Sequence, residues 1–83
     1  MKGEINIMGK VVVYSKANCG QCTFTKKELD KLGVSYEEKR IDLNPEFRDE
    51  AIAKGAMGAP FVVPPVGEPF SGFQPAKLAK LAV

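Results

Sequence analysis

The sequence has no histidine, no tryptophan and only two cysteines among its 83 residues. A protein zinc site needs about four ligands, drawn mainly from cysteine, histidine and carboxylate side chains, so the chain has too few of the usual ligands for a structural site of its own. Its formal net charge is only +2, and acidic residues interrupt the lysines and arginines. Nucleic-acid binding is not expected, because it needs a concentrated patch of positive charge. We likewise expect no bound metal and no cofactor.

Long hydrophobic runs are absent as well. No segment approaches the ~20 consecutive apolar residues of a membrane-spanning helix, and residues 1–9 lack the apolar run of a secretory signal. We therefore expect no membrane contact and a cytoplasmic location, where a close cysteine pair is more often catalytic or metal-binding than a permanent cross-link. The length predicts one domain, residues 10–83, after a lead-in at residues 1–9. Nothing in the sequence favours an obligate dimer, so we expect a monomer.

The first half of the domain has the pattern strand, helix, strand. Residues 11–14 form a β-branched run that predicts a strand buried on both faces, and a polar loop follows it. Helical periodicity begins at Gln21, and Gly33 is suited to end the helix, with Phe24 at the flank of its buried face or partly exposed. Residues 34–43 predict a second strand at a sheet edge, because its centre is strongly polar. The helix side chains expected to face inward are Cys22, Thr25, Leu29 and Leu32.

The second half predicts a helix, a hairpin and a last helix. Residues 45–55 predict a helix that opens with proline and that Asn44 is suited to cap. Residues 61–63 and 68–71 predict two short strands joined by a proline-rich turn. Pro75 opens the last helix. The side chains expected to face inward from these two helices are Phe47, Ala51, Ile52, Leu78 and Leu81.

The order of elements is therefore β-α-β-α-β-β-α. The first two strands must run parallel, because a helix joins them by a right-handed crossover. The short link between the last two strands forces a hairpin instead. The pattern predicts an α/β fold, with a four-stranded mixed sheet flanked by three helices.

The only strong chemical signal is Cys19-Gly20-Gln21-Cys22, which lies where the buried strand gives way to the first helix. Unpaired backbone N–H groups and the helix dipole favour negative charge at that end, so the pKa of the Cys19 thiol should be lowered. Cys22 lies one turn further in, where it should be more buried and protonated. The hypothesis is that Cys19 attacks a protein disulfide and that Cys22 then resolves the mixed disulfide.

Further interpretations of the cysteine pair remain open from the residues alone. The pair is compatible with a zinc site completed by carboxylates or by a second chain, with a structural disulfide, or with two inert core side chains. Pro60 directly precedes the third predicted strand. The sequence alone favours an ordinary trans bond before it, because only about one X–Pro bond in twenty is cis.

Several segments together resemble the glutaredoxin-like NrdH-redoxins. The similarity runs from about Lys10 to the C-terminus, and its most specific parts are the Cys-x-Gln-Cys core and Ser-Gly-Phe-Gln-Pro at 71–75. The remaining segments that carry it are Val-Tyr-Ser-Lys at 13–16, Thr-Lys-Lys at 25–27 and Gly-Ala-Pro at 58–60, which an apolar strand follows.

The resemblance implies a thioredoxin fold in which Cys19 is the attacking thiol and Cys22 the resolving one. It also implies a cis bond between Ala59 and Pro60, packed against the cysteine pair. Members of the family are recharged by thioredoxin reductase and supply electrons to ribonucleotide reductase, which are the expected donor and acceptor. The surface that meets these partners is expected to consist of Gly20, Gln21, Ala59, Pro60, Ser71, Gly72 and Phe73.

Three positions depart from the family pattern on or near this surface. Gly20 stands where the family often has a bulkier residue, Phe70 where tryptophan is usual, and Gln74 where arginine is usual. The nearest alternative function is that of a glutathione-dependent glutaredoxin, but residues 71–74 lack the acidic pair that helps such proteins to hold glutathione. The residues are also compatible with a non-catalytic binding module that uses the same surface, and with a metal-bridged dimer.

Overall fold

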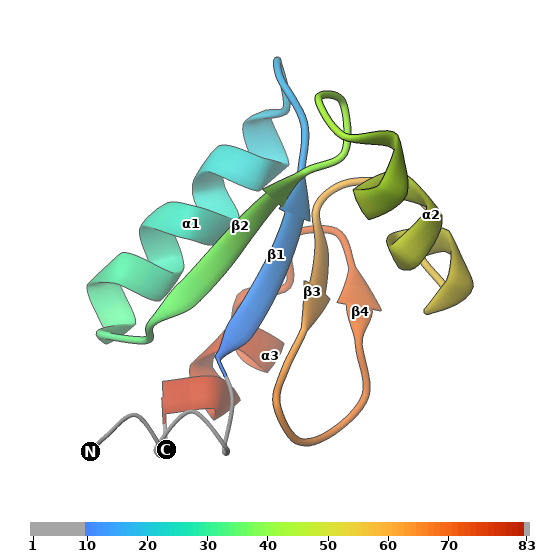
Figure 1. The fold of residues 1–83 in the computed structure, drawn as a ribbon. Helices are drawn as coiled ribbons and strands as arrows, with labels where there is room; N and C mark the ends of the chain where they lie inside the picture. Colours follow the sequence, from blue (N-terminus) through green and yellow to red (C-terminus); the bar gives the residue numbers. More distant parts are fainter. Residues whose placement is uncertain (1–9, 83) are drawn as a thin grey trace, which may run out of the picture.

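The computed structural model describes residues 10–82, in which a four-stranded sheet carries helices on both faces (Figure 1). The predicted lead-in, residues 1–9, lies outside the described residues. The strands are β1 (Val11–Ser15), β2 (Tyr36–Arg40), β3 (Phe61–Val63) and β4 (Phe70–Ser71). The helices are α1 (Gly20–Leu32), α2 (Pro45–Ala53) and α3 (Pro75–Ala79), followed by a 3₁₀ helix, Lys80–Ala82. The predicted order of elements is confirmed.

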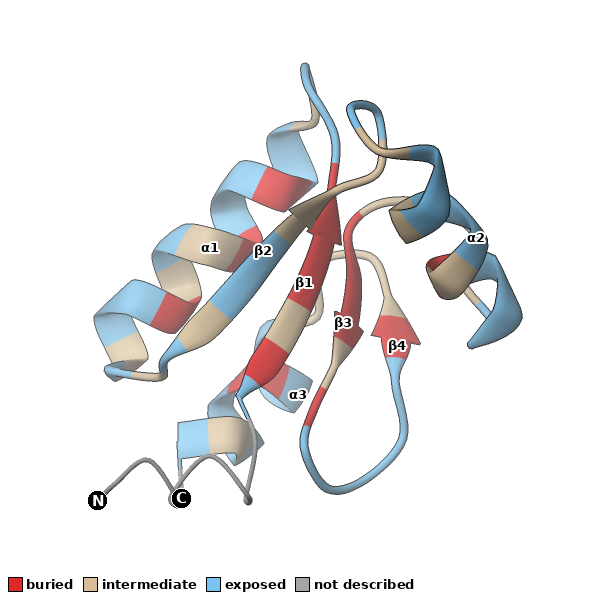
Figure 2. Ribbon diagram, viewed as in Figure 1, coloured by how far each residue is buried: buried red, intermediate tan, exposed pale blue. Residues whose placement is uncertain are grey.

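The strands lie in the order β2-β1-β3-β4. β1 pairs with β2 in parallel, whereas β1 with β3 and β3 with β4 are antiparallel, so the sheet is mixed, as predicted. β2 lies at one edge with its polar centre exposed (Figure 2). β4 is shorter than the predicted residues 68–71, because Pro69 has no N–H to give to the ladder. Among residues 10–82, no helix has the length and apolar character needed to cross a membrane.

Side chains of β1 point alternately to the two faces of the sheet and join two separate clusters. This alternation explains why β1 is almost completely buried (Figure 2). The buried members of the larger cluster, on the face covered by α1 and α3, are Val11, Val13, Leu29, Val62, Phe70 and Leu78. The buried members of the smaller cluster, on the face covered by α2, are Tyr14, Ala51 and Phe61.

β2 is shorter than the predicted residues 34–43, because the backbone at both ends is used elsewhere. At its start, the Val34 N–H donates to the Leu29 carbonyl at 2.9 Å and closes the end of α1. At its end, the Ile41 N–H still donates to the Ser15 carbonyl of β1 at 2.9 Å, but the chain then turns, and the Leu43 N–H donates to the Arg40 carbonyl at 3.4 Å. The N–H groups of Val34 and Leu43 therefore cannot join the ladder to β1, and the strand spans five residues.

One prediction for α2 is wrong, and another is confirmed only in part. Ile52 does not face the core, since it is 56 % exposed; it lies about 100° around the helix from buried Ala51. Asn44 takes the N-cap position, but its side chain makes no capping hydrogen bond. Pro45, at the first position of the helix, carries no N–H, so the helix start has one fewer donor to satisfy.

Tyr14 connects β1 to α2 through a polar contact beside the smaller cluster. Its hydroxyl donates to Glu50 Oε1 at 3.0 Å, and Lys39 Nζ donates to the same oxygen at 3.1 Å. Burial of the ring and the hydrogen bond to Glu50 raise the pKa of Tyr14 to about 12. The folded protein therefore keeps this phenol protonated in a range where an exposed tyrosine ionises.

We expect the free energy of unfolding of the oxidised protein to fall as the pH rises from about 10 to about 12, and Tyr14→Phe to remove part of this fall. Tyr14 ionises near pH 10 in the unfolded chain and near 12 in the folded protein. The unfolded state therefore holds fewer protons in this window, and stability decreases with rising pH. Two pKa units correspond to about 2–3 kcal/mol.

Urea unfolding of the parent and of Tyr14→Phe, measured from about pH 8 upwards, checks this expectation. Tyr36→Phe is the comparison variant: burial also raises the pKa of Tyr36, but this side chain lies on edge strand β2 and is only partly buried, so Tyr36→Phe should remove less of the fall than Tyr14→Phe. A fall as steep in Tyr14→Phe as in the parent contradicts the assignment.

Candidate active site

Cys19 and Cys22 lie at the N-terminus of α1 and are joined by a disulfide. Cys19 is the N-cap residue and Cys22 lies in the first turn, with 5.2 Å between their Cα atoms. Cys22 is only 2 % exposed, whereas Cys19 is partly exposed. A sulfur from another molecule can therefore reach Cys19 but not Cys22.

Backbone groups at the start of α1 surround Cys19. The Cys22 N–H donates to Cys19 Sγ at 3.1 Å, and the Thr23 N–H donates to the Cys19 carbonyl oxygen at 3.2 Å. A backbone N–H directed at the sulfur, together with the positive end of the helix dipole, stabilises negative charge at this position. In the reduced protein, this geometry favours the thiolate of Cys19.

The loop before β3 lies against the cysteine pair. Cys19 Sγ is 3.8 Å from the carbonyl oxygen of Ala59. The Ala59–Pro60 peptide bond is cis, and Pro60 is buried. The trans bond expected from the residues alone is therefore wrong, and the cis bond agrees with what the family resemblance implies.

The segment that follows β4 forms another side of the site. Gln21 Oε1, from within the cysteine motif, accepts a hydrogen bond from the Phe73 N–H at 3.0 Å. The Gly72 N–H donates to the Pro60 carbonyl at 2.8 Å. Gly72 has a φ of +86°, which residues with a side chain rarely adopt, and an added Cβ would lie 3.5 Å from Gln21 Oε1. Glycine therefore allows the segment to approach α1 closely.

The residues predicted to meet a partner come from three separate segments and lie around the disulfide. The hydroxyl of Ser71 accepts a hydrogen bond from the Met57 N–H at 3.4 Å, which fastens the end of β4 to the loop before β3. The segments at 19–22, 57–60 and 71–73 are thus linked to one another. The predicted set that they bring together is Gly20, Gln21, Ala59, Pro60, Ser71, Gly72 and Phe73.

Two exposed apolar side chains that the sequence does not assign to this surface, Phe24 and Met57, also lie at it. Phe24 is 56 % exposed, and its ring centroid lies 5.9 Å from that of Phe73. Met57 is 90 % exposed and lies two residues before Ala59. The position of Phe24 off the buried helix face indicates exposure, but no sequence signal indicates its partner. Exposed apolar side chains beside a reactive sulfur offer contacts to another protein.

A polar network flanks the cysteines on the side of β2. Glu38 Oε2 accepts hydrogen bonds from Ser15 Oγ at 2.5 Å and from Lys26 Nζ at 2.9 Å. The bond from Ser15, and then that from Lys26, hold the pKa of the Glu38 carboxyl below its usual value. Lys26 is therefore paired with a carboxylate, and little of its charge is available to stabilise Cys19.

Asp42 fixes the loop that precedes the cysteine motif. Its Oδ2 accepts a hydrogen bond from the Ala17 N–H at 3.2 Å. The Arg40 guanidinium donates to both carboxylate oxygens, at 2.7 and 2.5 Å, and is the main cause that lowers the pKa of Asp42 to about 2. Asp42 is thus ionised at any ordinary pH and holds the loop in place.

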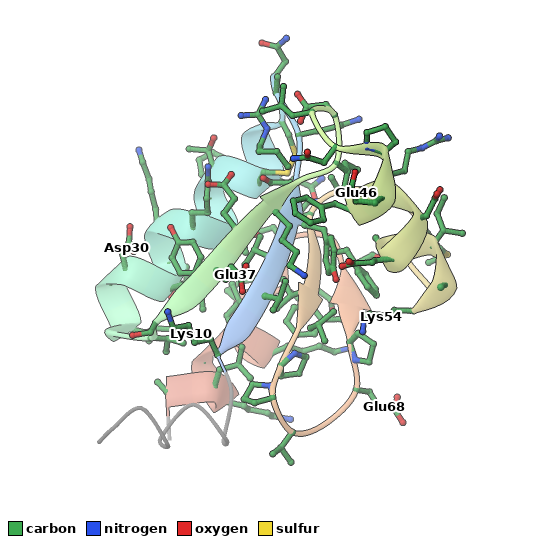
Figure 3. The ribbon with its side chains drawn as sticks, in the orientation of Figure 1. Lys10, Asp30, Glu37, Glu46, Lys54 and Glu68 are labelled. Atoms are coloured by element: carbon green, nitrogen blue, oxygen red, sulfur yellow. A yellow bond between two sulfur atoms is a disulfide. The ribbon has the colours of Figure 1, made fainter. Side chains whose placement is uncertain are left out.

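Charged side chains elsewhere are dispersed over several elements. Asp30, Glu46, Lys54 and Glu68 point outward at the periphery of the molecule (Figure 3). In the part of the chain that the structure describes, no three histidine, cysteine or acidic side chains lie close enough together to hold a metal ion.

Reduction of the disulfide yields an accessible thiol on Cys19 and a buried thiol on Cys22. The pair follows β1, an inner strand of a sheet with the order β2-β1-β3-β4. These features place the protein among the thiol–disulfide oxidoreductases with a thioredoxin fold.

Comparison with known proteins narrows this class. The glutaredoxin family model matches residues 11–65. Over 72 residues, the chain is 46 % identical to the glutaredoxin-like protein NrdH of Lactococcus lactis subsp. lactis, a match that covers 87 % of this chain and 99 % of that protein.

More distant relatives agree with this match. The chain is 32 % identical over 72 residues to the glutaredoxin-like protein NrdH of Salmonella typhimurium, which covers 86 % of each chain. Among solved structures, the NrdH-redoxin of Escherichia coli superimposes with a TM-score of 0.78 at 29 % identity and covers 87 % of this chain and 93 % of that one. The chain belongs to the glutaredoxin family, among its NrdH-like members.

Proposed function

We propose that this protein is an electron carrier that reduces protein disulfides, with Cys19 as the attacking thiol and Cys22 as the resolving thiol. The unequal burial of the two sulfurs carries the proposal, because Cys22 is 2 % exposed and Cys19 is partly exposed. A partner disulfide has access to Cys19 alone. Cys22 is placed to attack the sulfur of Cys19 from inside the protein.

The proposed cycle moves two electrons and leaves the protein oxidised. The Cys19 thiolate attacks one sulfur of the partner disulfide, and the second partner sulfur leaves as a thiolate. Cys22, as a thiolate, then attacks the sulfur of Cys19 in the mixed disulfide. The partner leaves with both of its thiols reduced, and the Cys19–Cys22 bridge forms. A reductase returns the bridge to the dithiol.

The surface around the disulfide supports a protein as the oxidised substrate. Gln21, Ala59 and Phe73 lie around the cysteines from three segments, and the exposed ring of Phe24 lies beside that of Phe73. Apolar contacts of this kind suit a protein surface. The family resemblance supports ribonucleotide reductase as the acceptor of the electrons.

We propose thioredoxin reductase, rather than glutathione, as the source of electrons. Residues 71–74 have the sequence Ser-Gly-Phe-Gln and carry no carboxylate, whereas glutaredoxins tend to hold glutathione with an acidic pair at this point. The structural relative from Escherichia coli is described as having a thioredoxin-like activity profile, which also favours this choice.

The cytoplasm, where thiols are kept reduced, is the compartment in which we propose that this cycle operates. The proposed working unit is a monomer whose domain comprises residues 10–83. The reduced protein needs only one copy of the Cys19–Cys22 pair for the cycle described above.

Reduction of insulin disulfides with NADPH tests the proposed electron source. One set of reactions contains thioredoxin reductase, and the second contains glutathione with glutathione reductase. We expect turnover with thioredoxin reductase and little with glutathione, and Cys19→Ser is the blank in both sets. Turnover with glutathione alone identifies a glutaredoxin, and no turnover in either set favours a non-catalytic binding module. Support of ribonucleotide reductase turnover by catalytic amounts of the reduced protein tests the acceptor.

A further inference from the structure

Thr25 carries a buried hydroxyl group for which the oxidised protein provides no hydrogen bond. The residue lies in α1 and is 0 % exposed. Among the residues that the structure describes, Thr25 Oγ1 is the buried side-chain oxygen that has no hydrogen-bond partner. A buried hydroxyl without a partner is costly, and valine has the same shape without that cost. Packing of the core therefore does not explain why this position carries a hydroxyl group.

Cys22 is the nearest redox-active group on the same face of the helix. Residues three apart in an α-helix are neighbours on its surface, and helix side chains lean toward the N-terminus, so Thr25 leans toward Cys22. Both side chains are buried, Cys22 at 2 % and Thr25 at 0 % exposure. The two groups thus share one closed region at the start of α1.

The sulfurs of the pair differ in their hydrogen bonds. Cys19 Sγ accepts the Cys22 N–H at 3.1 Å. Within residues 10–82, no hydrogen bond reaches the sulfur of Cys22. The hydroxyl of Ser15, which is also buried, is already donated to Glu38 at 2.5 Å. Thr25 is therefore the buried hydroxyl in this region that still has a proton to donate.

During the redox cycle the buried sulfur of Cys22 becomes negatively charged, and a buried negative charge needs a hydrogen-bond donor. When a reductase thiolate attacks the sulfur of Cys19, the Cys19–Cys22 bond breaks and its electron pair leaves with Cys22 as a thiolate. The same thiolate forms again before Cys22 attacks the mixed disulfide. A buried anion is strongly disfavoured unless a hydrogen-bond donor meets it. In the disulfide, by contrast, the sulfur carries no charge and needs no donor.

We propose that the Thr25 hydroxyl donates a hydrogen bond to the Cys22 sulfur when the disulfide opens, and that it stabilises the Cys22 thiolate in both directions of the exchange. Threonine in a helix has two accessible side-chain rotamers, so the hydroxyl can turn without movement of the backbone. The inference rests on the proposed role of Cys22 as the resolving thiol. It assigns to Thr25 a role that the spacing of the cysteine motif does not reveal.

Replacement of Thr25 by valine leaves the charged groups near the cysteines unchanged, so the replacement tests the hydroxyl group alone. A hollow of about 430 Å³ is bordered by both cysteines and by the charged side chains of Lys16, Lys26, Glu38 and Arg40. Lys26 is paired with Glu38 at 2.9 Å and Arg40 with Asp42 at 2.5 Å. Thr25→Val changes none of these charges, so a change at Cys22 reports the loss of the hydroxyl.

The test measures the pKa of Cys22 in a Cys19→Ser background, where Cys22 is the only thiol. The ultraviolet absorbance of the Cys22 thiolate, which needs no reagent to enter the buried site, is followed against pH for the parent, Thr25→Val and Thr25→Ser. We expect Thr25→Val to raise the pKa of Cys22 by about one unit, because a hydrogen bond to a charged group is lost. We expect Thr25→Ser, which keeps the hydroxyl, to restore the parent value.

A second measurement uses the protein with both cysteines. In a glutathione redox buffer, Thr25→Val should shift the equilibrium toward the disulfide by up to about tenfold at a pH where Cys22 is ionised. Oxidised Thr25→Val should unfold at a urea concentration no lower than the parent, because its hydroxyl has no partner in that state.

An unchanged pKa of Cys22 in Thr25→Val, or a failure of serine to restore it, overturns the proposal. A clear loss of stability of oxidised Thr25→Val, without such a loss in Thr25→Ser, also overturns it, because the hydroxyl would then be bound in the oxidised protein. None of these measurements uses a reductase or an acceptor protein. Their outcome is therefore separate from the identity of the electron donor proposed above.

Discussion

Replacement of Cys19 by serine is expected to abolish disulfide reduction, whereas replacement of Cys22 by serine is expected to leave the first attack intact. Cys19 is the sulfur that a partner can reach, and a serine hydroxyl is not ionised at neutral pH. The loss in Cys19→Ser should be at least on the order of a thousandfold, the scale found when a catalytic nucleophile is removed. Cys22→Ser should accumulate a mixed disulfide, because no second thiol releases the partner.

Mass spectrometry of each variant after incubation with an oxidised protein substrate checks this expectation. Cys22→Ser should gain the mass of one substrate molecule, and a reducing agent should remove it. Cys19→Ser serves as the matched control, because it also retains a single thiol, but at the buried position. Trapping by Cys19→Ser instead of Cys22→Ser would reverse the two roles.

The architecture was predictable because its signals are local. The β-branched run at 11–14 marks the central strand, and Gly33, with a φ of +73°, ends α1 where the sequence placed the stop. Proline at the first position marks the starts of α2 and α3. Each of these signals involves neighbouring residues, and the short connections then leave few ways to arrange the sheet.

Errors in the fold concern places where local preference competes with distant contacts. Ile52 follows Ala51 in α2, and both are apolar, so the sequence offers no means to choose which one faces the sheet. The structure buries Ala51 at 3 % exposure and leaves Ile52 at 56 %. A small residue lets the helix approach β1 and β3 closely, and the larger side chain is left outside.

The active site was predictable in its chemistry but not in its surroundings. The cysteine motif is local, and its position at a helix start follows from the pattern. The hydrogen bond from Phe73 to Gln21 and the bond from Ser15 to Glu38 each join residues far apart in the sequence. The unpartnered hydroxyl of Thr25 is likewise visible only in the packed structure. Threonine at that position looks from the sequence like one more inward side chain.

Replacement of Leu78 by alanine is expected to cause a large loss of stability. Leu78 is 0 % exposed, and it is the buried residue through which the five-residue helix α3 enters the larger cluster. Truncation of a fully buried leucine costs about 2–5 kcal/mol. This is a large part of the roughly 5–15 kcal/mol that stabilises a domain, so the melting temperature should fall by about 10 °C or more.

Leu81→Ala is the matched control, because Leu81 lies in the 3₁₀ helix after α3 and is only partly buried against the same cluster. Thermal unfolding of the oxidised proteins should show a clearly smaller loss for Leu81→Ala. Similar losses would contradict the placement of Leu78 as the anchor of α3. The consequence for function follows from the chain order: α3 begins directly after Gln74, whose side chain donates to the Ser71 carbonyl at 2.8 Å. A loosened α3 should therefore weaken docking of protein substrates before it affects alkylation of Cys19 by a small reagent.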